Sequence, residues 1–61
     1  MDRDEWNFRA VAESGRHRYE VKTKTFASAE RSARQILRHN EVFDSVRVED
    51  RKGQTLKVVR R

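Results

Sequence analysis

Two runs of alternating apolar and polar residues, separated by a short turn, constrain the fold of this chain most strongly. Trp6, Phe8, Ala10 and Ala12 share one parity in residues 6–13, and residues 17–25 alternate in the same way. A period of two is typical of strands that bury one face. The turn sequence Ser14-Gly15 lies between the runs, so together they predict a β-hairpin.

The register of this hairpin follows from a two-residue loop at Ser14-Gly15. The expected pairs are Glu13 with Arg16, Ala10 with Tyr19, Phe8 with Val21 and Trp6 with Thr23. All apolar members then share one face, an agreement that a shift of one residue would destroy.

An apolar stripe at helical spacing follows the first hairpin. Its members are Phe26, Ala29, Ala33, Ile36 and Leu37, the pattern of one buried face of an α-helix. Ser28 is the expected N-cap, with Thr25 as a competing cap, and Asn40 is expected at the left-handed C-cap position.

A second hairpin is predicted in the last third of the chain. Arg51-Lys52-Gly53 fits a three-residue loop with Gly53 in the left-handed bulge position. The expected pairs are Asp50 with Gln54, Val48 with Leu56, Arg47 with Lys57, Val46 with Val58 and Asp44 with Arg60.

The order strand, strand, helix, strand, strand predicts an α+β fold: a two-layer β-β-α-β-β domain with one helix on a four-stranded sheet made of two hairpins. It is expected to be a single small domain over residues 1–61, with residues 1–4 and 60–61 frayed. The expected core is Trp6, Phe8, Ala10, Tyr19, Val21, Phe26, Ala29, Ala33, Ile36, Leu37, Val46, Val48, Leu56 and Val58. A core this thin favours a homodimer, and the first and last strands are candidate edges for it, whereas charges on those strands favour a monomer.

Composition narrows the functional class. The chain has 61 residues, 34% of them hydrophobic and 41% charged, with no cysteine and a net charge of +5. Disulfides and thiolate metal sites are excluded, and no apolar run approaches the length of a membrane span. The charged start, Met1 to Glu5, does not resemble a signal peptide, so a cytoplasmic location without membrane contact is expected. The basic excess favours nucleic acid or an acidic protein as partner.

The polar parity of the predicted strands collects basic side chains on the open face of the sheet. In the expected registers Arg9 faces Glu20 as a neutral pair, whereas Arg47 faces Lys57. Two opposed cations are destabilising, and an anion bound between them would relieve that cost. The candidate nucleic-acid-binding residues are Arg18, Lys22, Lys24, Arg47 and Lys57; the alternative is an ordinary solvated face.

A secondary basic surface is expected along the helix at Arg31, Arg34 and Arg38, with Arg60 and Arg61 as candidate neighbours. The five aromatic residues fall on the inward parity or at helix ends. A base-stacking platform on the open face is therefore not expected, and binding would be dominated by phosphates.

The sequence carries no enzyme signature. Glycine-rich phosphate loops are absent, and neither His17 nor His39 has neighbours at metal-ligand spacing. No catalytic residue, metal or cofactor is expected. We therefore expect a small non-enzymatic module that contacts nucleic-acid phosphates; the alternative is a regulator or inhibitor that docks on an acidic protein surface.

Overall fold

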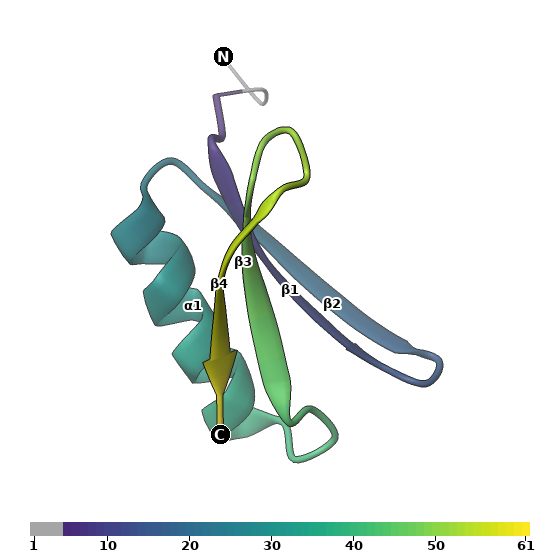
Figure 1. Cartoon of the computed structure of the whole chain (residues 1–61). Helices are drawn as coiled ribbons and strands as arrows, with labels where there is room; N and C mark the ends of the chain where they lie inside the picture. The colour runs from purple at the N-terminus through teal and green to yellow at the C-terminus, as the bar shows by residue number, and fades with distance from the viewer. Residues whose placement is uncertain (1–4) are drawn as a thin grey trace.

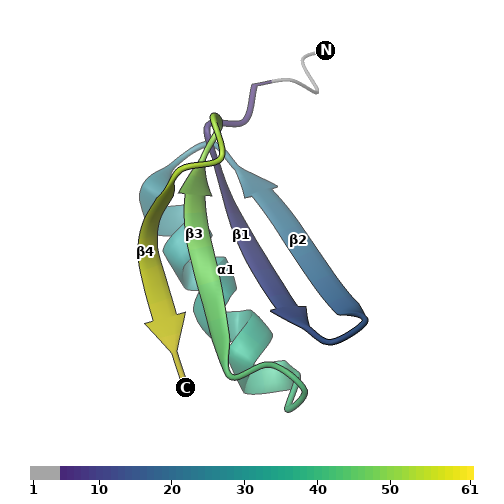
Figure 2. The ribbon, with the colours of Figure 1, turned by 45° about the vertical axis from the view of Figure 1, so that its right-hand side comes forward.

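The computed structural model, which describes residues 5–61, confirms the predicted two-layer α+β fold. The elements are β1 (Phe8–Ser14), β2 (His17–Thr23), α1 (Phe26–His39), β3 (Ser45–Asp50) and β4 (Thr55–Arg60). The strands form one antiparallel sheet in the order β2-β1-β3-β4, and α1 covers one face of it (Figures 1 and 2). Within residues 5–61, no helix is long and apolar enough to cross a membrane.

The first hairpin exists, but its register is two residues away from the expected one. Ser14 pairs with His17, so the two loop residues are Gly15 and Arg16. Gly15 has a φ of +59°, a conformation that glycine adopts without strain at the first central position of a hairpin turn. Because the shift is an even number of residues, the apolar side chains keep their common face, and Ala10 now lies opposite Val21.

β1 lies inside the sheet, because its second neighbour is β3. Ala10 pairs with Val48 on the helix side, and Arg9 pairs with Glu49 on the open side. The expectation that the first strand could be a sheet edge is wrong; the edges are β2 and β4.

The ends of α1 differ in detail from the sequence expectation. Thr25, not Ser28, is the N-cap, and its side chain accepts a hydrogen bond of 3.1 Å from the Ser28 backbone N–H. Asn40 is the C-cap but is extended rather than left-handed, with a φ of −135°. Its backbone N–H and its side-chain amide both donate to the carbonyl of Ile36, which satisfies the helix end without a left-handed residue.

The second hairpin has the expected loop, but beyond the loop its strands pair in a different register from the expected one. Gly53 has a φ of +93°, and its N–H donates to the carbonyl of Asp50 at 3.0 Å. A β-bulge at Leu56 then shifts the pairing, because Glu49 pairs with Thr55 while Val48 pairs with Lys57. The bulge exchanges the two faces for the rest of β4.

The core therefore departs from the expected set at several positions. It contains Ala12, Phe43 and Val59, which the expected set does not include, and it lacks Trp6, Leu56 and Val58. Tyr19 has the predicted parity but is 52% exposed, because it lies on the edge strand. The other expected residues, from Phe8 to Val48, pack in or against the core.

Of the residues expected to fray, 1–4 lie outside the described residues, whereas 60–61 are held in place. Arg60 is the last residue of β4. The backbone N–H of Arg61 donates to the carbonyl of Asp44 at 3.1 Å. Residues 60–61 are therefore held by backbone hydrogen bonds and are not frayed.

Candidate functional site

The open face of the sheet carries a continuous line of alternating charges rather than a basic patch. Six side chains form it, in the order Glu20, Arg9, Glu49, Arg47, Glu13 and Arg18, and each is ion-paired to the next at 2.7–3.0 Å. We call these six residues the charge ladder. Three carboxylates balance three guanidinium groups, so the ladder has no net charge.

The charge ladder is also part of the packing. Val11 lies on the open side of β1, yet only 1% of its surface is exposed, and it faces Glu20 and Arg47 of the ladder across the neighbouring strands. Glu49 is itself 6% exposed. The aliphatic parts of long charged side chains can cover apolar surface in this way.

Hydrogen bonds within the ladder shift the pKa values of Glu13, Arg47 and Arg9. The pKa of Glu13 is lowered because its carboxylate accepts hydrogen bonds from Arg47 and then Arg18. The pKa of Arg47 is raised, mainly by its hydrogen bond to Glu13, and that of Arg9 mainly by its hydrogen bond to Glu49. The charged form of each group is thus favoured by its neighbours.

The expected opposition of Arg47 and Lys57 is wrong. The bulge in β4 places Val58 opposite Arg47 and turns Lys57 to the other face, where its ammonium group contacts the carboxylate of Glu30 on α1. That contact is the main cause of a lowered pKa of Glu30. The argument for an anion between the two cations therefore no longer holds.

The remaining predicted contacts on the open face are dispersed. Lys22 lies over the ring of Trp6, 5.1 Å from its centroid, and Lys24 is ion-paired with Glu5 at 3.4 Å. Trp6 does not face the core as expected; its ring has Arg9 and Arg51 as further neighbours, at 5.9 and 5.3 Å. An aromatic ring thus does lie on this side of the sheet, but cations already contact it.

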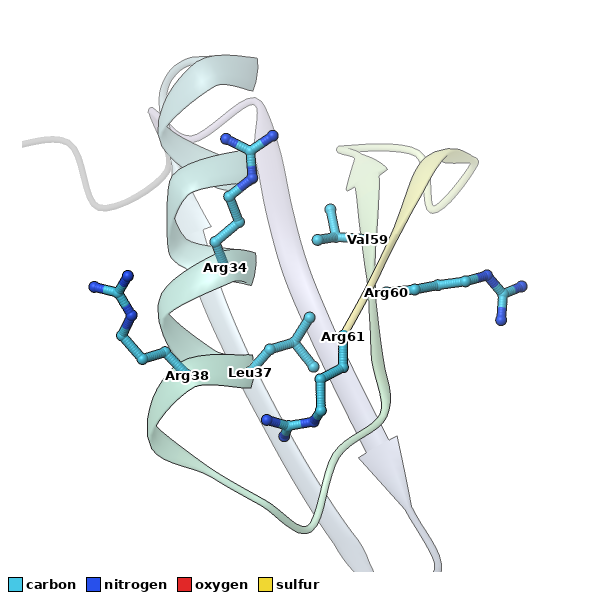
Figure 3. A pocket seen from close by; sticks show the side chains of 6 residues that line it. All are labelled: Arg34, Leu37, Arg38, Val59, Arg60 and Arg61. Carbon is cyan, nitrogen blue, oxygen red and sulfur yellow. The ribbon is translucent and has the colours of Figure 1, made fainter.

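Unbalanced charge gathers instead where α1 and the end of β4 lie side by side. Arg31, Arg34 and Arg38 project from the exposed side of α1, and Arg61 follows β4. We call these four residues the arginine surface. A groove with a volume of about 390 Å³ runs between the two elements, with Leu37 and Val59 at its apolar base. In Figure 3, Arg34 and Arg61 lie beside this groove, the guanidinium group of Arg38 points away from β4, and Arg60 points to the far side of β4.

Local structure explains why these arginines stand together. Arg31, Arg34 and Arg38 occur at i, i+3 and i+7, which places them on one helix face, opposite the buried residues Ala33 and Ile36. The guanidinium group of Arg61 donates hydrogen bonds of 2.7 Å to the carbonyls of Asn40 and Phe43. These bonds hold its charge beside the helix without neutralising it.

Carboxylates are scarce on this surface. Within residues 5–61, the one ion pair made by its four arginines joins Arg34 to Glu30 at 3.2 Å, and Glu30 is shared with Lys57. Like-charged neighbours three and four residues apart on a helix destabilise it by about 0.2–0.5 kcal/mol per pair. A bound anion would remove this repulsion.

The described residues hold no group of three or more histidines, aspartates or glutamates that could bind a metal ion. His17 begins β2, and His39 lies in the last turn of α1, so the two stand on separate elements.

The sequence predicts the helix arginines as a secondary basic surface, after the sheet face. The relevant signal was present: the helix spacing of three arginines with a single acidic residue, Glu30, within the same helix. Arg60 and Arg61 are the expected candidate neighbours of this surface, and the structure brings Arg61 beside α1 while Arg60 points to the far side of β4.

In comparisons with known proteins, no family model, curated protein or solved structure matches the chain.

Proposed function

We propose that this protein is a non-enzymatic binding module of the cytoplasm that contacts nucleic-acid phosphates through its arginine surface. The observation that carries the proposal is the separation of charge between the two faces. On the sheet face the six charges of the ladder balance one another, whereas of the four arginines on the helix side Arg34 alone has an ion-pair partner among the described residues. Four of the 15 basic residues of the chain thus lie together on the helix side, where one described carboxylate, that of Glu30, pairs with one of them.

The chemistry and spacing of these side chains suit a phosphate backbone. A guanidinium group donates paired hydrogen bonds to phosphate oxygens and keeps its charge at all physiological pH values. Arg31 and Arg38 are seven residues apart, which is about 10 Å along a helix axis. This length corresponds to about three base-pair steps of duplex DNA, so adjacent phosphates of one strand lie within reach.

Such a surface would bind with little sequence preference. Phosphate contacts fix position but do not read bases. Trp6 is the one described aromatic ring on the open side of the sheet, and its ring is already in contact with Lys22, Arg9 and Arg51. We therefore expect similar affinity for unrelated duplex sequences.

The experiment is a salt titration of the affinity for a fluorescently labelled mixed-sequence DNA duplex, followed by anisotropy. Three or four phosphate contacts predict a slope of about −3 in a plot of log K against log salt concentration. The double variant Arg31→Gln/Arg38→Gln is expected to make this slope less negative by about 2 units. Both residues are exposed, so folding should be unaffected.

The matched control is Lys22→Gln/Lys24→Gln, which removes the same charge from the sheet side. It is expected to leave the slope nearly unchanged. Absence of binding at low salt, or a larger loss in the control than in the helix variant, would contradict the proposal. Binding of poly-glutamate at least as tight as binding of the duplex at the same salt would favour the alternative, an acidic protein surface as partner.

A further inference from the structure

The charge ladder begins and ends on the same edge strand, with charges of opposite sign. Glu20 is one end and Arg18 is the other, both on the open face of β2. Between them the ladder passes through β1 to β3 and returns through β1. An edge strand with unpaired backbone groups is a template for another strand, and here it also presents two unlike charges two residues apart.

We propose that β2 pairs antiparallel with β2 of a second copy of this chain, with Tyr19 opposite Tyr19 of that copy. In this register Arg18 faces Glu20 of the second copy, and Glu20 faces its Arg18. Opposite residues in an antiparallel pair share a face, so the two ladders join into one closed ring of alternating charges. The proposal specifies the edge and register of the homodimer that the thin core favours, and it does not depend on nucleic-acid binding.

The charge pattern selects this register over its neighbour. A shift of two residues that centres the pair on Glu20 would oppose two carboxylates directly, which is destabilising. The register centred on Tyr19 has a smaller cost at its ends, where Arg16 would face Lys22 of the second copy. Both of these side chains are exposed, and Lys22 is turned toward Trp6.

The helix side of β2 supplies apolar surface to bury. Tyr19 is 52% exposed there, beside a groove of about 250 Å³ that Val21 and Ile36 line. Figure 2 shows that α1 lies behind the sheet and that β2 forms the edge opposite β4. In the pair, the two tyrosine rings would lie at the floor of a cleft bounded by both helices.

The other edge is less suited to self-pairing. β4 carries the bulge at Leu56, a feature that protects edges. Its charged side chains, Lys57 and Arg60, are both positive, so two copies of this strand would gain no opposite-charge pair. β2 alone among the two edges is complementary to itself.

The test is sedimentation equilibrium of the full chain from about 10 μM to about 1 mM. The wild type is expected to approach twice the monomer mass. Arg18→Glu and Glu20→Arg each convert two attractive pairs into repulsive ones, so each alone is expected to weaken association about tenfold or more. An equimolar mixture of the two variants restores complementarity and is expected to form the mixed dimer.

Arg60→Glu, a charge reversal on the opposite edge, is the matched control and is expected to associate like the wild type. Tyr19→Lys leaves the ladder intact and should weaken association from the helix side, which keeps the test valid if a ladder variant fails to fold. A wild type that stays monomeric at the highest concentration overturns the proposal. So does undiminished association of folded Arg18→Glu or Tyr19→Lys, or a mixture that associates no better than its components.

Discussion

At the scale of single residues, Glu49 is the buried charged residue of the open face. It is 6% exposed and receives hydrogen bonds from Arg9 at 2.9 Å and Arg47 at 3.0 Å. Glu49→Ala leaves two guanidinium groups without their shared acceptor, and it is expected to lower the free energy of unfolding by about 1.5–3 kcal/mol. Glu20, at one end of the ladder, has a more exposed side chain than Glu49, so Glu20→Ala should cost less than about 1 kcal/mol.

Urea unfolding of the two variants measures this difference. Equal losses of unfolding free energy for Glu49→Ala and Glu20→Ala would show that the centre of the ladder contributes no more to stability than its end. The sequence alone indicated part of the arrangement, since alternation places both residues on the open face. It could not reveal that Glu49 bridges two arginines, because this depends on β1 and β3 being neighbours.

At the scale of elements, the bulge in β4 reverses the expected roles of its apolar residues. Val59 is 9% exposed and belongs to the core, whereas Leu56 is 46% exposed. Val59→Ala is therefore expected to cost about 2 kcal/mol, and Leu56→Ala about 0.5–1 kcal/mol. Thermal or urea unfolding of both variants decides the matter, and a larger loss for Leu56→Ala would mean that β4 follows the register expected from its sequence.

The elements themselves could be predicted because each carries its own periodicity. The alternation of residues 6–13 and 17–25 and the helical stripe from Phe26 to Leu37 are local signals, and both survive in the structure. The bulge is different. Both Val58 and Val59 could supply an apolar side chain to the core, and the choice depends on Val59 meeting Val46 and Lys57 meeting Glu30.

At the scale of the whole molecule, strand order decides where charge is neutralised. The order β2-β1-β3-β4 brings Glu13, Glu20 and Glu49 among Arg9, Arg18 and Arg47. The same order places β4 and Arg61 beside the helix arginines. Neither consequence follows from one hairpin alone, which is why the sequence could not show that the charges on the sheet face balance one another.

The most direct test of this account is a map of backbone amide and arginine side-chain NMR shifts during titration with a short DNA duplex. The largest changes are expected at Arg31, Arg34, Arg38 and Arg61, with the sheet face nearly unaffected. Largest changes at Arg18, Lys22 and Arg47, with an unchanged helix, would contradict it.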